Sequence, residues 1–360
     1  MRKRIVTTLA TLILFATAVQ AQKLPEPKLE PTPSTPAQEE LIREGVSLHD
    51  RRDFDGAISR YEQVLKENPN NVLALYEIAF AYFEKKEYQK TLDYAYKLAQ
   101  FKSDLLPRVY VQIGNAQDEL GEPKKAVETY KAGIKLFPSS FLIHYNLAIT
   151  YNKLGEHEEA RKAVKKSAGF NPQHPSSQLL LASLFDRGAY KTPALLAACR
   201  FLVLEPNSQR SAGALNLVAK SMQAGVAPGK DANTINIFVD TSTKKDEGDF
   251  GAIDFVISLT KAAEKMDAKK GKTEMQVLVS SFETTFAVLG EQKADNSKFT
   301  WKFYVPYFVE MKKQGHVEAF VYYTNQRRGA PEVKEWLSQH RHTVANFLAW
   351  SRSYSWPRMD

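Results

Sequence analysis

The chain is poor in the residues that build disulfides and metal sites. Among its 360 residues there is one cysteine, Cys199, which cannot form an internal disulfide. It follows Ala197 and Ala198 on the inward side of a predicted helix, so we expect a small buried core residue and not a nucleophile. His340 and His342 lie two residues apart and would occupy different faces of a helix, and the other histidines show no metal-ligand spacing. We therefore expect neither a metal site nor a cofactor.

Motifs of catalysis are also missing. The sequence contains no Gly-x-Ser-x-Gly, no His-Glu-x-x-His and no phosphate-binding loop. The acidic stretch 246–249 lacks the alternating ligands and the closing glutamate of a calcium loop, and a solvated turn that opens the next helix explains it better. We predict that the protein is not an enzyme. A catalytic pair assembled from distant positions within residues 232–360 is the alternative that the sequence leaves open.

The sequence has one long apolar run, and it lies at the N-terminus. The basic residues Arg2–Arg4 precede the apolar stretch Ile5–Val19, which is short for a bilayer span. Val19 and Ala21 are small residues at the two positions that a signal peptidase reads, which predicts cleavage before Gln22. We expect residues 1–21 to be a signal peptide and the mature chain to be periplasmic or secreted. An uncleaved N-terminal anchor is the alternative.

Positive charge is present but not concentrated. The formal net charge is +8, and three of these charges lie in the expected signal peptide, which leaves about +5 spread along the mature chain. Nucleic-acid binding requires a clustered basic face. We therefore expect no nucleic-acid partner.

Prolines dominate residues 22–37. Their close spacing forbids helix and sheet and favours an extended, polyproline-like chain. We interpret this segment as a linker between the signal peptide and the first folded residue. The prolines concerned are Pro25, Pro27, Pro31, Pro33 and Pro36.

Residues 38–208 repeat a pattern with a step of 34 residues. Laying the stretch from 141 onto the stretch from 175 aligns Leu147 with Leu181 and Pro172 with Pro206. In each unit, apolar residues recur three and four apart, a short polar turn follows, and a second helix has a small residue where it crosses the first. The pattern predicts five pairs of antiparallel helices. The units are 38–71, 72–106, 107–140, 141–174 and 175–208, and the second is one residue longer than the others.

The five units resemble tetratricopeptide repeats. Small residues occur where the paired helices would approach closely, at Gly45, Ala79, Gly114, Ala148 and Ala182, and prolines close most second helices. The resemblance implies an all-α, right-handed superhelix whose units fold cooperatively with their neighbours. It also implies that the first helices line a concave groove, and that this groove holds a protein or peptide partner.

The groove positions of the family can be transferred to this sequence unit by unit. Relatives that bind chaperone tails use a Lys and Asn clamp for a terminal carboxylate, but the positions here, Ile42, Val46, Tyr76 and Phe80, are apolar. Aromatic residues with few charges suit an extended peptide or an amphipathic helix. Packing on a neighbouring unit or on the linker is the other explanation of these aromatic residues. The candidate partner-binding residues are Tyr76, Phe80, Phe83, Asn115, Asp118, Tyr145, Asn152, Lys153, Asp186 and Arg187.

The rest of the chain differs in composition. Residues 209–224 fit a capping helix over the fifth unit, and Gly225, Pro228 and Gly229 mark the boundary. Residues 232–360 contain all four tryptophans and are predicted to form a mostly helical domain packed on the end of the array. Alternation at Ile235, Ile237 and Val239 predicts one short strand. The predicted helices are 253–263, 275–289, an aromatic hairpin 303–311 and 317–323, and one last helix from 331 to 348.

Together these features predict an exported scaffold of the cell envelope that binds a protein or peptide partner. The alternative is a glycan-binding envelope protein, because aromatic rings near basic residues can stack on sugars. The candidate residues for glycan or partner contacts are Trp350, Tyr354 and Trp356. Docking of the C-terminal tail is the other explanation of these three rings.

Overall fold

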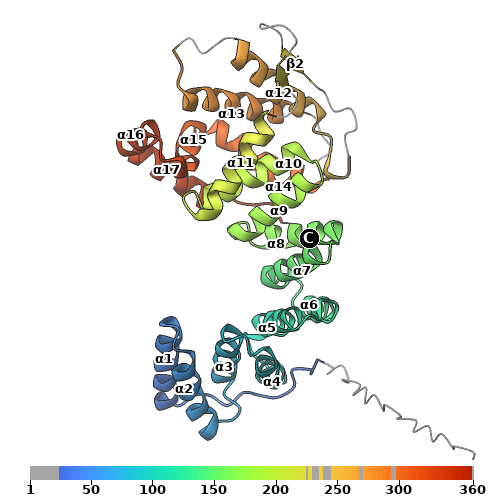
Figure 1. The fold of residues 1–360 in the computed structure, drawn as a ribbon, viewed down its shortest axis with the longest axis vertical. Coiled ribbons are helices and arrows are strands. Elements are labelled where there is room, and N and C mark those ends of the chain that lie inside the picture. The colour runs from blue at the N-terminus through green and yellow to red at the C-terminus, as the bar shows by residue number, and fades with distance from the viewer. Residues whose placement is uncertain are drawn as a thin grey trace, which may run out of the picture.

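The computed structural model describes residues 24–223, 226–228, 235–237, 245–266, 271–292 and 297–358. The predicted signal peptide, the end of the predicted strand at Val239 and the boundary glycines Gly225 and Gly229 lie outside these residues. A helical array leads into a second helical region, which is stacked on the end of the array (Figure 1). Within the described residues, no helix is both long and apolar enough to cross a membrane.

The array consists of five antiparallel helix pairs, as predicted. The first helix of each pair packs on the second, and each second helix packs on the first helix of the next pair, which builds the superhelix. Capping side chains and prolines fix several starts: Asn71 Oδ1 accepts from the Ala74 amide at 2.9 Å, and Pro175 occupies the first turn of its helix. The pairs are α1 (Pro36–Asp50) with α2 (Phe54–Glu67), α3 (Val72–Glu84) with α4 (Tyr88–Leu98), α5 (Leu106–Glu119) with α6 (Pro123–Leu136), α7 (Phe141–Lys153) with α8 (His157–Phe170), and α9 (Pro175–Arg187) with α10 (Lys191–Leu204).

Small residues allow the paired helices to approach closely, which confirms the prediction made from the repeat pattern. A Cβ atom added to Gly45 would lie 2.4 Å from the Tyr61 ring, and one added to Gly114 would lie 2.3 Å from the Tyr130 ring. Both tyrosines are completely buried. A tyrosine of the second helix therefore fills the space that glycine leaves on the first.

The turns inside the pairs share one backbone conformation. Each contains a residue with φ between 61° and 79°, in the left-handed region that favours glycine. Two of these residues are glycines, and the other three are not. They recur at the repeat spacing, at Arg52, Lys86, Gly121, Gly155 and Ala189.

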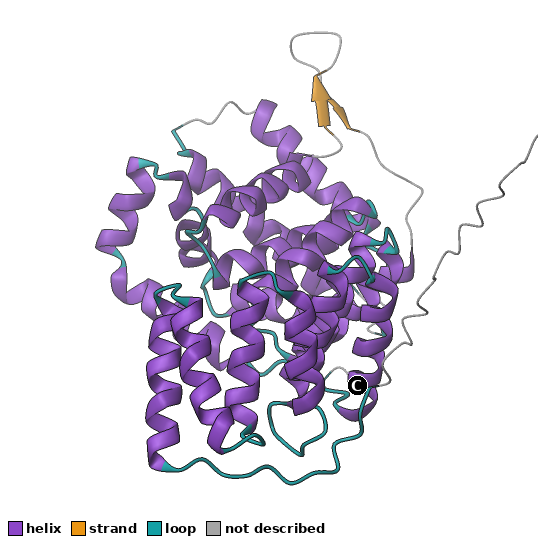
Figure 2. Ribbon diagram, turned by 60° about the horizontal axis from the view of Figure 1, so that its bottom comes forward, coloured by secondary structure: helices purple, strands orange, loops and turns teal. Residues whose placement is uncertain are grey.

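The proline-rich segment is extended, as predicted, but it lies on the array. Residues 24–35, called here the N-terminal strap, run along the edge where successive pairs are connected; Figure 2 shows this loop leaving α1 at the bottom. Leu29 forms a parallel bridge with Phe101, in the connection between α4 and α5. The Asn68 amide, at the end of α2, donates to the Pro33 carbonyl at 3.2 Å. The strap thus crosses two inter-repeat connections.

The remaining elements form a mostly helical C-terminal domain. The predicted capping helix is present, and the predicted strand pairs antiparallel with a second strand. The last helix was predicted as one and is two, because the chain leaves helical geometry at His340, whose φ is −112° and ψ 32°. The elements are α11 (Gln209–Gln223), β1 (Val226–Pro228), β2 (Ile235–Ile237), η1 (Lys245–Glu247), α12 (Gly251–Met266), α13 (Glu274–Glu291), α14 (Phe299–Lys313), α15 (Val317–Thr324), η2 (Gln326–Arg328), α16 (Pro331–Gln339) and α17 (Arg341–Ser353).

One hydrophobic core joins this domain to the end of the array. It runs from α5 through α10 and α11 into α12–α17 without interruption. Helix α10 lies at its centre, and nearly all of its residues are buried, including Cys199 as predicted. Burial raises the pKa of the Cys199 thiol, so the neutral thiol is the stable form.

The buried face of α10 contains a cation, Arg200. Its guanidinium donates to Gln173 Oε1 at 2.9 Å, to Ser351 Oγ at 3.0 Å and to Tyr307 Oη at 3.2 Å. It also lies 4.8 Å from the ring centre of Trp356. Burial lowers its pKa, and these neutral oxygens and ring faces offset part of the cost of burying the charge. Arg200 therefore joins the last repeat to the C-terminal tail.

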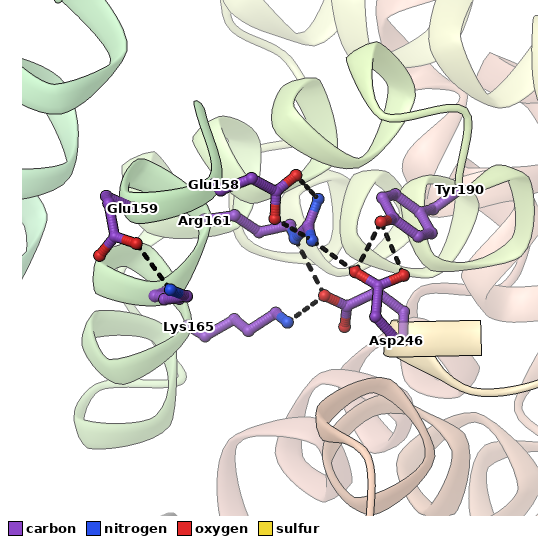
Figure 3. Close-up of polar contacts among 8 residues, drawn as sticks. Glu158, Glu159, Arg161, Lys165, Tyr190 and Asp246 are labelled. Atoms are coloured by element: carbon purple, nitrogen blue, oxygen red, sulfur yellow. Dashed lines mark hydrogen bonds and ion pairs between the residues drawn. The ribbon is translucent and has the colours of Figure 1, made fainter. Parts of the chain in front are cut away.

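A second polar contact joins α8 to η1 (Figure 3). Arg161 lies 3.0 Å from Glu247 and 2.7 Å from Asp246, and Lys165 also contacts Glu247. The Tyr190 hydroxyl donates to Asp246 at 2.7 Å. Glu247 is 1% exposed. Burial raises the pKa of Glu247 and lowers the pKa of Lys165, and their mutual attraction opposes both shifts.

Removing the Glu247 charge should loosen the junction. Glu247→Gln leaves the cations of Arg161 and Lys165 in a buried place without this counter-charge, so we expect the free energy of unfolding to fall by about 3 kcal/mol. Urea unfolding at neutral pH measures this. The matched control is Glu159→Gln, which removes one carboxylate from an exposed pair with Lys162 on the same helix and should leave stability near the wild-type value. Equal losses in the two variants would contradict the role of the buried cluster.

Candidate functional site

The ten candidate partner-binding residues all lie on first helices. Helix α1 packs beside α3, α3 beside α5, and α5 beside α7, so their outward side chains form one surface, called here the first-helix face. Eight of the ten are half-buried, whereas Lys153 and Arg187, at the ends of α7 and α9, are exposed. The face divides into an aromatic part on α1 and α3 and a polar part on α5, α7 and α9.

The aromatic part centres on α3. Phe80 stacks on the His49 ring of α1, with ring centres 4.8 Å apart and planes 28° apart. Phe83 packs on Tyr88 at 5.4 Å, and Tyr76 packs against the core shared with α5. All three candidate rings keep part of their surface exposed. Leu73, one turn before Tyr76, is 38% exposed and extends the strip. Part of each ring therefore remains available to a partner.

Most of the polar candidates bind one another or their neighbours. Asp118 accepts from Lys153 at 2.7 Å and so links α5 to α7. Asp186 accepts from Lys220 of α11 at 2.7 Å. Asn152 contacts the His157 ring at 3.1 Å. These side chains tie successive helices together, and they occupy their own hydrogen-bonding groups in doing so.

Two further candidates have structural contacts of the same kind. Tyr145 packs edge-on against the His174 ring with 4.9 Å between centres. Asn115 Oδ1 accepts a hydrogen bond from the Tyr130 hydroxyl at 2.6 Å. The aromatic strip on α3 is therefore the part of the candidate set with most surface available to a partner.

Repeat one lacks the hydrogen bond that repeat three has. Tyr61 occupies the position of Tyr130, and Val46 occupies the position of Asn115, 69 residues earlier in both cases. The Tyr61 hydroxyl is buried and has no hydrogen-bond partner within the residues that the structure describes. Burial raises the pKa of Tyr61, and the nearby carboxylates of Glu77 and Asp50 raise it further.

Asp50, Tyr61 and Glu77 were not among the sequence candidates. Glu77 is half-buried on α3, and its pKa is raised by burial and by the like charge of Asp50, while Arg108 opposes this shift. Aligning repeats one and three would have exposed the unusual Val46 opposite a buried tyrosine. The proximity of Asp50 to Glu77 could not be read from one repeat, since the residues belong to different pairs.

The C-terminal aromatic candidates face inward. Trp350, Tyr354 and Trp356 all pack on Tyr307, with ring centres 5.1, 5.0 and 4.8 Å away. Each is half-buried. Their arrangement matches the tail-docking explanation, and their ring faces are occupied by other rings.

A surface hollow of about 650 Å³ lies between α13 and α14. Its wall is largely apolar, and Glu310 and Lys313, 4.0 Å apart, lie on its rim. Burial raises the pKa of Tyr354, which also lines it, to about 12. Across the described residues, no three His, Cys, Asp or Glu side chains are grouped to hold a metal ion.

Comparison with known families identifies the array. Family models described as tetratricopeptide repeat match residues 48–90 and 111–175. These residues belong to tetratricopeptide repeats. The pair α9 and α10, which follows the matched residues, packs on α8 as the other pairs pack on their predecessors, and it completes an array of five.

Curated relatives match the array over part of their length. A TPR repeat-containing protein of Methanocaldococcus jannaschii is 28% identical over 128 residues, which are 35% of this chain and 22% of that protein. The Hsp70-Hsp90 organising protein of Plasmodium falciparum is 26% identical over 145 residues, 39% of this chain and 25% of that protein. The chain thus spans about a quarter of the length of these relatives.

Part of the chain is also similar to solved structures. A thermophilic TPR protein of Thermus thermophilus is 21% identical and has a TM-score of 0.43, covering 51% of this chain and 98% of that one. The type IV pilus biogenesis factor PilW is 17% identical with a TM-score of 0.42, covering 52% of this chain and 92% of that one.

The Tyr61 and Tyr130 contacts predict opposite effects of two substitutions. Asn115→Val leaves the buried Tyr130 hydroxyl without its acceptor and should lower the free energy of unfolding by about 1–3 kcal/mol. Val46→Asn supplies an acceptor to Tyr61 and should raise it by about 1 kcal/mol, since Val and Asn have similar helix propensity. Urea unfolding of the mature chain measures both. Stability changes of the same sign would show that the hydroxyl pairing does not set the difference between the repeats.

Proposed function

We propose that this protein is an exported scaffold that binds a protein or peptide partner on its first-helix face. The supporting observation is the apolar strip on α3, formed by the exposed Leu73 and the partly exposed rings of Tyr76, Phe80 and Phe83. Aromatic and aliphatic anchors in a row along a helix suit an extended peptide or the apolar side of a partner helix. Tetratricopeptide repeats mediate protein–protein interactions, and one matched relative is named as an organiser of Hsp70 and Hsp90.

The rest of the array favours this surface over others. The N-terminal strap covers connections between the first repeats, and the C-terminal domain covers α10 and α11. Among the polar candidates, Asp118 of α5 and Lys153 of α7 are bound to each other, and Asn115 and Asn152 bind residues of the second helices. A partner would therefore have its largest apolar contact on α3, with α1 and α5 on either side. The rings of Trp350, Tyr354 and Trp356 stack on Tyr307, so we place the binding site on the array and not on a glycan platform in the tail.

We propose further that the protein works outside the cytoplasm without enzymatic activity. The basic start, the apolar run and the small residues before Gln22 support export. Cleavage there would keep the whole described strap, which begins at Leu24, in the mature protein.

Mass spectrometry of the protein recovered from its own cells tests the export proposal. We expect a mature N-terminus at Gln22 in the envelope or extracellular fraction, because the signal peptidase reads Val19 and Ala21. A chain that keeps residues 1–21 and sediments with membranes would favour the anchor instead.

The binding proposal is tested with the mature chain from Gln22 onward. A random twelve-residue peptide library is selected on the wild-type protein, and the affinity of the selected peptides is measured by fluorescence anisotropy. Tyr76→Ala combined with Phe80→Ala should weaken binding by about tenfold or more, because it removes two anchors. The control is Leu136→Ala, which removes a side chain that is 51% exposed on α6. Unchanged affinity in the double variant, with an unchanged circular dichroism spectrum, would refute the proposal.

A further inference from the structure

The aromatic strip has an acidic border on one side. Asp50 ends α1 one residue after His49, and Glu77 lies one turn before Phe80 on α3. Burial raises the pKa of Glu77, and the negative charge of Asp50 nearby raises it further. The stacked rings of His49 and Phe80 thus lie next to a pair of carboxylates.

Two buried polar atoms at this place have no partner in the part of the chain that the structure describes. They are the Tyr61 hydroxyl, in a side chain that is 0% exposed, and Nε2 of His49. Glu77 and Asp50 are the charges that act on the Tyr61 hydroxyl, which places it beside them. Buried polar groups are nearly always paired in folded proteins. The unpaired Tyr61 hydroxyl near two carboxylates, together with the unpaired Nε2 of His49, therefore indicates a site for a polar group that the described residues do not supply.

The next repeats show what the chain supplies elsewhere. In repeats three and four, Asp118 of α5 binds Lys153 of α7 at 2.7 Å. The positions that correspond to these residues in repeats one and two, 69 residues earlier, are His49 and Glu84. Where the later repeats place a lysine on this face, repeat two places a further carboxylate. The cation that links the later repeats is therefore replaced at this junction by negative charge.

We propose that Asp50, Tyr61, Glu77 and the stacked rings of His49 and Phe80 form a subsite for a lysine or arginine side chain of the bound peptide. This inference rests on the proposed function and specifies the partner as a basic peptide. The carboxylates pair with the cation, and the face of Phe80 contributes a cation–π contact. The same carboxylates repel a peptide carboxylate or phosphate.

Arg108 of α5 modulates this subsite. It faces Glu77 and interacts with Tyr76, so it neutralises part of the negative charge on the α5 side. Asp50 belongs to α1, and α3 packs between α1 and α5. A ligand cation therefore enters between α1 and α3, and Arg108 opposes its binding.

The first experiment uses the peptides selected from the random library on the mature wild-type chain. Lysine and arginine should be enriched among them. Glu77→Gln should weaken their binding by about tenfold. Arg108→Gln should strengthen it by about threefold, because a competing positive charge is removed. The control is Glu128→Gln, which removes an equal charge from α6 and should leave the affinity unchanged.

The second experiment requires no selected partner. Nα-acetyl-lysine methylamide is titrated at millimolar concentration into mature protein with ¹³C-labelled histidine and tyrosine, and Nα-acetyl-norleucine methylamide serves as the uncharged control. The NMR signals of the His49 ring, assigned by comparison with His49→Gln, should shift with the lysine compound alone. The shift should be lost in Glu77→Gln.

The outcomes separate the subsite from the binding function. Peptides that require Tyr76 and Phe80 but show no basic enrichment and no response to Glu77→Gln would overturn the cation subsite and leave the scaffold proposal intact. Binding of the lysine compound together with peptide affinities that ignore Tyr76 and Phe80 would show a cation site that the peptides do not use, and would refute both the proposed face and its peptide subsite. Equal NMR responses to the lysine and norleucine compounds would overturn the subsite directly.

Discussion

The contact between a tyrosine and a glycine inside a helix pair is the constraint on which this structure depends. Gly45 and Gly114 leave no room for a Cβ atom beside the rings of Tyr61 and Tyr130. The helices of these pairs can therefore approach to ring-contact distance, and each buried tyrosine fixes their separation. Because every pair packs on the next, this spacing sets the stacking of the array. It also directs the tyrosine hydroxyl toward the first-helix face, where any polar group that it meets must come from the first helices or from a partner.

Repeats one and three differ in the residues around this tyrosine, and we expect that difference to determine binding specificity. In repeat three, Asn115 accepts a hydrogen bond from the buried tyrosine. Asp118 and Lys153 form an ion pair that joins repeats three and four. Repeat one has Val46 at the asparagine position, and its tyrosine faces carboxylates instead. The fold tolerates the difference because packing, and not the hydrogen bond, supplies most of the stability of such a pair. Because the stability of the pair does not require an asparagine at position 46, the surface beside Tyr61 can serve recognition.

The local pattern of the sequence was enough to predict the five pairs, since residues three, four and 34 apart determine helices and their pairing. It was not enough where distant segments meet. The prolines predicted an extended chain but could not show that Asn68 holds it on the array. Helical periodicity continued through His340, although the chain bends there and places the Trp336 ring 4.3 Å from the His340 ring. The acidic side of the aromatic strip joins residues of two pairs, and periodicity within one pair says nothing about it.

The two ends of the array consequently have different roles. At the C-terminal end, the buried Arg200 and the cluster around Glu247 join the last repeats to a domain that shares their hydrophobic core. Charges buried there resist separation, because each would lose its partners before water could replace them. A partner that bound the inner side of the last repeats would have to displace the C-terminal domain from this shared core. Repeats one and two have half-exposed rings with carboxylates beside them instead. A partner can contact the half-exposed rings there without displacing a hydrophobic core, so recognition is expected at the N-terminal end of the face.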